Sequence, residues 1–329
     1  DLSSGIFTAA GMGTDTLVSI EGVVATDGDD TLIGTADDNI FVVGRGNDTI
    51  TGGDGIDWIS LEGRATSISV RADFLSSGSV DLSGFGVKTF TGIEGVIGTE
   101  FNDVFRGDAN KQYYDGGAGN DIFVVSGGAD VLLGGAGTDL LDLRGSNTRV
   151  SINLYNDIVN DGGDFGALEI ESFENIFTTN ADDFVNGTSG ANTIRTFDGN
   201  DTIYAQQGDD LVLSGRGDDY IGGWYGDDRL YAGGGDDRVE GQFGDDFLNG
   251  ENGNDELFGG DGNDTIFGGA GDDLVEGGAG NDRLRGGSDT NIINGGEGDD
   301  VIYGWGSATE TIDGGAGRDA LTYRFALGE

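Results

Sequence analysis

Residues 196–303 read, in blocks of nine, TFDGNDTIY AQQGDDLVL SGRGDDYIG GWYGDDRLY AGGGDDRVE GQFGDDFLN GENGNDELF GGDGNDTIF GGAGDDLVE GGAGNDRLR GGSDTNIIN GGEGDDVIY. The twelve blocks follow one another without a gap, and position eight is a large aliphatic residue in all of them. Position six is Asp in eleven blocks, with Asn291 as the exception, and position four is Gly in eleven, with Asp289 as the exception. A period held this long indicates a repeat architecture.

Each half of the nonapeptide predicts a local structure. The glycine-rich half can adopt positive φ and form a tight turn. The second half is a short strand whose alternation points the aliphatic residue to one side. Such a strand cannot bury a core alone, so successive copies have to stack. The glycine spacing and the lack of a 3.6-residue apolar period exclude helix. The absence of proline suits strands that need every N–H for pairing.

The composition excludes several classes of function. The 329 residues include no cysteine and no histidine, so disulfides, thiolate metal sites and imidazole chemistry are ruled out. Acidic residues outnumber basic ones 61 to 16, which gives a formal net charge of −45. That charge opposes binding to nucleic acid and to anionic membranes, and no stretch has the roughly 20 apolar residues of a membrane-spanning helix. Cations are the expected partners.

The nonapeptide resembles the repeat of the RTX family of secreted bacterial calcium-binding proteins. The resemblance implies an all-β fold, a right-handed parallel β-roll with two nonads per coil and calcium ions in the turns between neighbouring coils. Position-six carboxylates then stack at steps of eighteen residues in two rows. One row contains Asp201, Asp219, Asp237, Asp255 and Asp273, and the other contains Asp210, Asp228, Asp246, Asp264, Asp282 and Asp300.

Calcium chemistry fits this pattern. Calcium takes six to eight oxygen ligands and accepts backbone carbonyls, so each ion needs two turns and their carbonyl oxygens as well as the carboxylates. Further nonads at 43–60, 116–124 and 134–142, a shortened copy at Gly127 and a C-terminal copy add five candidate ligands, Asp48, Asp57, Asp121, Asp139 and Asp319. The block 286–294, which carries Asn291, is expected to form a weak or empty site.

Two stretches of about fifty residues interrupt the period, and they resemble each other. Residues 90–107 align with 170–187, which pairs Glu94 with Glu174 and Asp103 with Asp183, and residues 17–34 form a third copy. We expect irregular, longer coils there, with small lateral caps as the alternative. The expected segments are 1–34, the end of a long repeat unit; 35–107 and 108–187, each with nonads and one irregular stretch; 188–322, an uninterrupted roll; and 323–329, the start of a further unit. The chain is expected to be a piece or a processed product of a longer repetitive protein.

Six residues depart from the repeat at eighteen-residue spacing. Position two holds Gln206, Trp224 and Gln242, and position three holds Gln207, Tyr225 and Phe243. Stacking predicts that they form one patch, which we call the aromatic patch. Sugar-binding and protein-binding surfaces favour such groups; packing against a loop or against another chain's roll is the alternative. Arg238 and Glu256, one coil apart, are expected to pair.

The pattern favours a calcium-binding structural module of an exported bacterial protein, which folds on meeting extracellular calcium. The resemblance implies type I secretion and an extracellular or cell-surface location. A second hypothesis is a repeat of an S-layer, adhesin or filament, whose partners are copies of itself or a cell-surface polysaccharide. The third, an accessory region of a secreted polysaccharide-modifying enzyme, would place catalysis around Arg149, Tyr155 and Asp157; we do not expect a catalytic site. Neither nucleic acid nor membrane insertion is expected.

Overall fold

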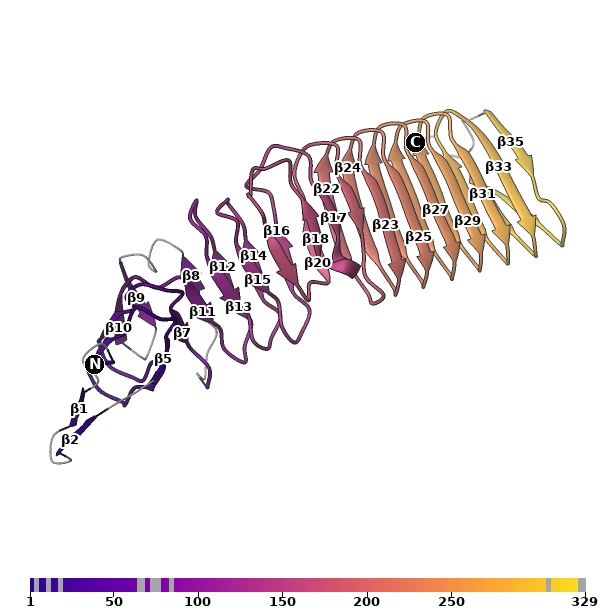
Figure 1. The fold of residues 1–329 in the computed structure, drawn as a ribbon. Coiled ribbons are helices and arrows are strands. Elements are labelled where there is room, and N and C mark those ends of the chain that lie inside the picture. The colour runs from indigo at the N-terminus through magenta and orange to yellow at the C-terminus, as the bar shows by residue number, and fades with distance from the viewer. Residues whose placement is uncertain are drawn as a thin grey trace, which may run out of the picture. The chain divides into compact units, whose positions relative to one another are not determined.

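The computed structural model describes residues 1–2, 6–9, 13–16, 20–63, 69–71, 78–82, 86–305 and 309–324. Most of the predicted segment 323–329 lies outside these residues. The chain forms two compact units, of which unit 1 comprises Asp1–Gly145 and Gly163–Phe173, and unit 2 comprises Ser146–Gly162 and Glu174–Glu329 (Figure 1). Among the described residues, no helix is long and apolar enough to cross a membrane.

Unit 2 is a solenoid built from two parallel sheets whose strands alternate along the chain. One sheet has the order β17-β21-β23-β25-β27-β29-β31-β33-β35, with β18 beside β17, and the other runs from β20 through the even-numbered strands to β36. Ile203 pairs with Ile221 and Val212 with Leu230, a step of eighteen residues in both sheets. Two nonads therefore make one coil, and the predicted parallel β-solenoid is confirmed.

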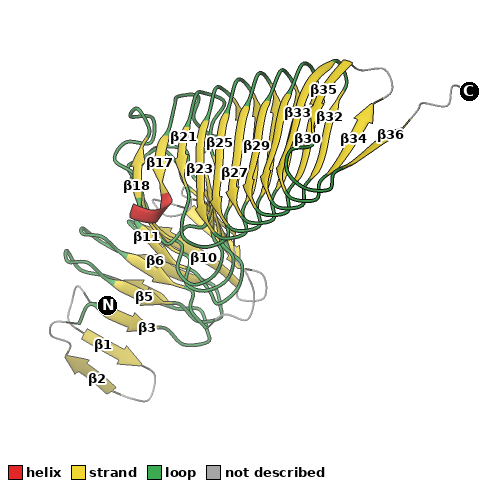
Figure 2. Ribbon diagram, turned by 90° about the vertical axis from the view of Figure 1, so that its right-hand side faces the viewer, coloured by secondary structure: helices red, strands yellow, loops and turns green. Residues whose placement is uncertain are grey.

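The strands of unit 2 are β17 (Ser151–Asn153), β18 (Ile158–Asn160), β20 (Asn175–Phe177), β21 (Phe184–Asn186), β22 (Thr193–Asp198), β23 (Thr202–Gln207), β24 (Leu211–Arg216), β25 (Tyr220–Tyr225), β26 (Arg229–Gly234), β27 (Arg238–Phe243), β28 (Phe247–Asn252), β29 (Glu256–Asp261), β30 (Thr265–Ala270), β31 (Leu274–Ala279), β32 (Arg283–Gly287), β33 (Thr290–Glu297), β34 (Val301–Trp305), β35 (Thr309–Asp313) and β36 (Ala320–Arg324). One turn of 3-10 helix, η1 (Leu154–Asn156), separates β17 from β18. The connecting loops lie at both edges of the strands (Figure 2).

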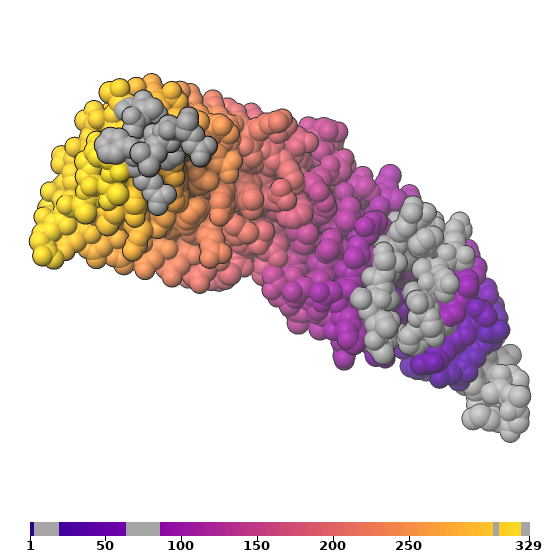
Figure 3. Space-filling model, turned by 180° about the vertical axis from the view of Figure 1, so that it is seen from behind, coloured from indigo at the N-terminus to yellow at the C-terminus, as the bar shows by residue number. Residues whose placement is uncertain are grey.

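The core of unit 2 is the stack of position-eight residues between the two sheets. All twelve of these aliphatic side chains, from Ile203 to Ile302, are buried. Because the coils that carry these residues repeat every eighteen residues, each side chain packs on its counterpart in the next coil, and the colour in Figure 3 changes steadily along this stack towards yellow at the C-terminal end. Burying the equivalent of one Val, Leu or Ile contributes about 1.5–3 kcal/mol, so the core grows with each nonad.

Unit 1 has the same architecture with shorter strands. One parallel sheet has the order β19-β15-β13-β11-β7-β5-β3. The strands that face it belong to two sheets, one of order β4-β6-β10-β9 and one that contains the parallel series β8, β12, β14 and β16. Strands β1 and β2 form a separate antiparallel pair. The strands are β1 (Ile6–Ala9), β2 (Gly13–Thr16), β3 (Gly22–Val24), β4 (Thr31–Ile33), β5 (Ile40–Val42), β6 (Asp48–Thr51), β7 (Trp58–Ser60), β8 (Ser69–Arg71), β9 (Gly78–Leu82), β10 (Gly86–Thr91), β11 (Gly95–Ile97), β12 (Val104–Arg106), β13 (Tyr113–Asp115), β14 (Ile122–Val124), β15 (Val131–Leu133), β16 (Leu140–Asp142) and β19 (Glu169–Glu171).

The irregular stretches continue the solenoid with longer coils. In the first, Trp58 of β7 pairs with Gly95 of β11, a step of 37 residues instead of eighteen. In the second, Val131 of β15 pairs with Glu169 of β19, a step of 38. The additional residues include an antiparallel hairpin in each stretch, β9–β10 in the first and β17–β18 in the second. The predicted longer coils are therefore present, and each carries a hairpin.

Candidate calcium centres

The position-six aspartates of unit 2 form two continuous rows, one at each edge of the strands. The N–H of Asp228 donates to Oδ1 of Asp246 at 2.8 Å, and the N–H of Asp246 donates to Oδ1 of Asp264 at 2.8 Å. The same bond repeats every eighteen residues from Asp183 to Asn291 in one row and from Asn192 to Asp300 in the other. A last step of nineteen residues leads from Asp300 to Asp319. One carboxylate oxygen in each coil is thus used to hold the neighbouring coil.

The second carboxylate oxygen, Oδ2, has no comparable hydrogen bond in most of these aspartates. Among the described residues, the Oδ2 atom of fifteen aspartates is buried and accepts no hydrogen bond. These are Asp48, Asp57, Asp121, Asp139, Asp201, Asp210, Asp219, Asp228, Asp237, Asp246, Asp255, Asp264, Asp273, Asp282 and Asp300. Fourteen of the sixteen predicted ligands therefore have a buried oxygen that accepts no hydrogen bond, whereas at Asp48 the ammonium of Lys88 lies 2.8 Å from that oxygen. Buried carboxylates normally pair with a donor or a metal, so the arrangement fits a cation.

Burial raises the pKa of thirteen of these carboxyl groups, namely Asp300 and the twelve whose values are given below. Loss of hydration is the largest cause at each, nearby carboxylates add to it, and the N–H of the preceding coil opposes it. The raised pKa is about 8 for Asp210, Asp237 and Asp246; about 7 for Asp121, Asp201, Asp264 and Asp273; and about 6 for Asp57, Asp219, Asp228, Asp255 and Asp282. Ionised rows near neutral pH are therefore unfavourable without a cation.

The turns between the rows suit an ion that prefers oxygen ligands. Within the described ranges, no group of three or more acidic side chains is placed to hold a metal ion, so carboxylates alone do not complete a coordination shell. Backbone carbonyls of the glycine-rich turns have to supply the remaining ligands, and calcium accepts them. Position two takes positive φ even where it is not glycine, at Gln206 (88°), Trp224 (81°) and Gln242 (80°). The turn conformation is thus kept at the cost of local strain, as expected where a binding geometry has to be repeated.

Position five has a role that the sequence did not reveal. The N–H of Asn263 donates to Oδ1 of Asp245, and the N–H of Asn281 donates to Oδ1 of Asn263. These bonds also repeat every eighteen residues, and they run in the direction opposite to the position-six bonds. The Asp and Asn side chains at position five therefore link adjacent turns by hydrogen bonds, whereas the sequence suggested only that they contribute to the negative potential.

A second kind of turn satisfies its carboxylate without an ion. In the irregular stretches, the N–H of Thr179 donates to Oδ2 of Asp183 at 2.9 Å, and its hydroxyl donates to both carboxylate oxygens. Thr99 makes the same contacts with Asp103, and Thr26 with Asp30. We call these threonine turns. The Asp of each threonine turn lies eighteen residues before a position-six Asp of the next coil and donates its N–H to it: Asp201, Asp121 and Asp48 respectively.

Three residues differ from the sequence-based expectation or were absent from it. Asp319 accepts the N–H of Asp300 at 3.2 Å but is itself exposed, unlike the other predicted ligands. Asn291 takes the place of a carboxylate and donates its amide to the Ser288 carbonyl at 3.0 Å, so it has no orphaned oxygen. Asp130, which was not predicted, is buried, and burial raises its pKa to about 7.

The six residues of the aromatic patch lie side by side on β23, β25 and β27. Gln206 pairs with Trp224 and Trp224 with Gln242, while Gln207, Tyr225 and Phe243 pair in the same way. The rings of Tyr225 and Phe243 stack at 4.8 Å with an interplanar angle of 6°. Both rings and Trp224 are exposed. The patch thus exposes three aromatic side chains to solvent.

Comparison with known families identifies the repeat. The family described as "RTX calcium-binding nonapeptide repeat (4 copies)" matches residues 24–59, 91–148 and 177–321, which is more than half of the chain. The chain belongs to this family. Its RTX repeats bind several Ca²⁺ ions.

Comparisons with individual proteins add little. No relative is found among curated proteins. Among solved structures, the chain is similar to a hyperactive, Ca²⁺-dependent, β-helical antifreeze protein from an Antarctic bacterium, at 20% identity over 84% of each chain with a TM-score of 0.24. At that TM-score the likeness bears on neither fold nor function.

Proposed function

We propose that this chain is a calcium-dependent structural module of an exported bacterial protein, and that it folds when it meets extracellular calcium. The observation that carries the proposal is the buried Oδ2 that accepts no hydrogen bond in fourteen aspartates other than Asp48, which lie in register. Interactions between coils supply a partner for Oδ1 but none for Oδ2, so the fold is electrostatically incomplete without cations.

Charge explains why folding should follow binding. Adjacent coils of a parallel sheet lie about 4.8 Å apart, so ionised aspartates in one row repel each other, and the net charge of −45 opposes compaction throughout the chain. A bound Ca²⁺ ion neutralises two such charges and bridges two turns. Because the turns exist only in the folded chain, binding free energy becomes folding free energy.

The affinity expected of such sites suits an exported protein. Extracellular calcium modules commonly bind in the range of about 10⁻⁴–10⁻³ M, which lies above a typical cytosolic calcium level. The chain would then stay unfolded in the cytosol and fold outside the cell, which is compatible with one-step export by a type I system. The family membership supports this location, since RTX repeats are typical of secreted bacterial proteins.

A calcium titration followed by far-ultraviolet circular dichroism tests the proposal. In excess chelator the spectrum should be predominantly that of a coil, and most of the β structure should appear cooperatively as calcium rises into the range given above. A spectrum of native intensity in chelator would contradict it, and so would a transition complete at cytosolic calcium concentrations. Magnesium at the same ionic strength is the control, because it demands a smaller octahedral shell and should not replace calcium.

The aromatic patch favours a second candidate function, a repeat of a cell-surface assembly. Three exposed aromatic side chains beside the calcium turns form a surface that could bind a polysaccharide or a second copy of this chain. The double variant Trp224→Ala, Tyr225→Ala tests this candidate. It should keep calcium-dependent folding and lose any ordered assembly seen by electron microscopy or any retention on cell-wall polysaccharide. Unchanged assembly and retention would count against a role for the patch.

A structural role also fits better than a catalytic one. Arg149, Tyr155 and Asp157, which the sequence allowed as a polysaccharide site, are all exposed, and Tyr155 is 65% exposed on η1. Such exposure does not provide the water-excluded surroundings in which charged groups become effective catalysts.

A further inference from the structure

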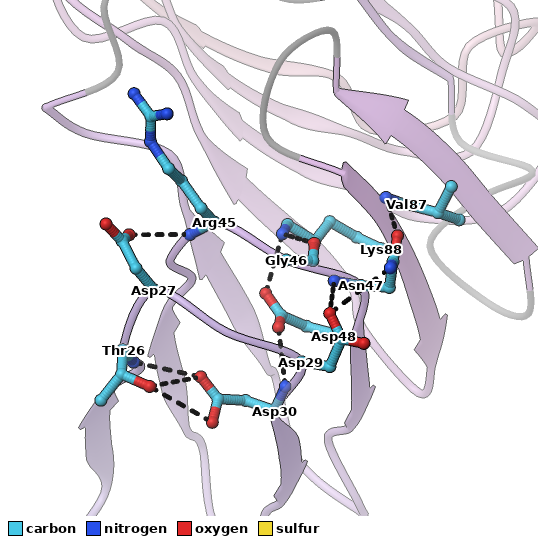
Figure 4. Close-up of polar contacts among 10 residues, drawn as sticks. All are labelled: Thr26, Asp27, Asp29, Asp30, Arg45, Gly46, Asn47, Asp48, Val87 and Lys88. Atoms are coloured by element: carbon cyan, nitrogen blue, oxygen red, sulfur yellow. Dashed lines mark hydrogen bonds and ion pairs between the residues drawn. The ribbon is translucent and has the colours of Figure 1, made fainter.

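In unit 1, the row of position-six residues that begins at Asp30 contains a lysine, Lys88, where the repeat predicts a carboxylate. Asp30, Asp48 and Lys88 lie in successive coils (Figure 4). The N–H of Asp30 donates to Oδ1 of Asp48 at 3.0 Å, as in the rows of unit 2. In the next coil, β10 pairs in parallel with β6 so that Lys88 stands opposite Asp48. Lys88 therefore occupies position six of a degenerate nonad.

The register around Lys88 confirms this reading of β10. The N–H of Val87 donates to Oδ1 of Asn47 at 3.0 Å, which is the position-five bond of a regular nonad. Phe90 stands opposite Ile50, the position-eight residue of the previous coil, and both are buried. Apart from Lys88, the strand thus makes the contacts that a calcium-binding coil would make at the same place.

The Lys88 ammonium lies among the oxygens of the preceding turn. Its Nζ is 2.8 Å from Oδ2 of Asp48 and donates to the carbonyl of Gly46 at 2.6 Å. The side chains of Lys88 and Asp48 are both fully buried. The oxygen that is orphaned at the other position-six aspartates therefore faces a positive charge here, and a backbone carbonyl of the same turn faces it as well.

We propose that the Lys88 ammonium replaces calcium in this row, so that the turn at Gly46 and Asp48 closes without a metal ion. The charge balance is the same in both cases. Two carboxylates and one Ca²⁺ ion sum to zero, and so do one carboxylate and one ammonium. A bound Ca²⁺ ion beside Lys88 would leave the site with an excess of buried positive charge, which is strongly unfavourable.

The other end of the row is closed by the protein as well. Thr26 donates its N–H and its hydroxyl to Oδ2 of Asp30 at 3.1 Å each. The row from Asp30 to Lys88 is thus satisfied from end to end by side chains and backbone. It differs in this from the rows of unit 2, and it gives the N-terminal coils one edge that holds together independently of calcium.

The test counts calcium ions bound per chain, by equilibrium dialysis of the full chain against CaCl₂. Lys88→Asp restores the consensus carboxylate and should add one bound ion per chain relative to the wild type. Lys111→Asp makes the same charge change at an exposed residue and should add none. Lys88→Met keeps the bulk without the charge and should also add none. In chelator, amide protection of β4 and β6 should be lower in Lys88→Asp than in the wild type.

The inference would be overturned by an unchanged calcium count in folded Lys88→Asp, or by an equal gain in Lys111→Asp. Failure of Lys88→Asp to fold in saturating calcium would also overturn it, because calcium could not then take the place of the ammonium. The inference rests on calcium binding by the other turns, and the two failures are distinguishable. A wild type that binds no calcium refutes the proposed function, whereas a wild type that binds calcium without a gain in Lys88→Asp refutes only the role of Lys88.

Discussion

Replacing one interior position-six carboxylate should weaken the fold only when calcium is present. Asp246→Asn keeps an oxygen that can accept the N–H of Asp228 but replaces the orphaned Oδ2 with an amide nitrogen, which cannot bind a cation. If one ion is lost, the free energy of unfolding should fall by about 2.7 kcal/mol at a calcium concentration of 100 times the Kd. The loss should shrink as calcium is lowered.

Without calcium the sign should reverse. Burial raises the pKa of Asp246 to about 8, so near neutral pH the carboxyl group opposes folding and its neutral amide replacement does not. Calcium-free Asp246→Asn should therefore be at least as compact as calcium-free wild type. Chemical denaturation followed by circular dichroism, at several calcium concentrations and in chelator, measures both effects.

The neighbouring residue provides a matched control. Asp245→Asn removes the same charge one position earlier, at an exposed side chain whose Oδ1 accepts the N–H of Asn263. Asn already occupies position five in four of the twelve nonads, so Asp245→Asn should change stability little and should leave the calcium count unchanged. Equal losses in Asp245→Asn and Asp246→Asn would refute the assignment of the orphaned oxygens to calcium and would indicate a general charge effect.

Two further outcomes are expected. In chelator, acidification should increase β structure. The carboxyl groups have a pKa near 3.8 in the unfolded chain and about 6 to 8 in the folded chain, so they stabilise the fold when protonated and lose that contribution as the pH rises through the folded values. In calcium, acidification should instead raise the calcium concentration needed for folding, and a circular-dichroism titration without any pH dependence would contradict both statements. Thr179→Val removes the hydroxyl that bonds Asp183 and should cost about 1.5–3 kcal/mol of stability with or without calcium, whereas a loss seen only in calcium would mean that this turn binds an ion.

The regular part of the chain was predictable because one period determines both the core and the row of carboxylates. Once nonads are known to pair at eighteen residues, Ile203 must stack on Ile221 and Asp201 on Asp219. The predicted Arg238–Glu256 pair is confirmed for the same reason, at 2.6 Å across one coil. Because both partners are largely exposed, this pair contributes at most about 1 kcal/mol.

The irregular part was less predictable because different chemistry replaces the same repeat position. Thr179 and Asp183 do not match the nonad pattern, yet the spacing of eighteen from Asp183 to Asp201 was a usable signal. Asp130 lies nine residues from both Asp121 and Asp139 and could have been found in the same way. Lys88 had no such signal, because its place in the row depends on a coil of 40 residues between β6 and β10 that sequence spacing does not reveal.

Amide hydrogen exchange of the full chain, with calcium and in excess EDTA, tests the central claim most directly. Residues 196–303 should be protected in calcium and should lose that protection across the whole array in EDTA, because each coil there depends on a cation for its second carboxylate oxygen. Equal protection of this array in both conditions would show that the rows of aspartates are stable without calcium.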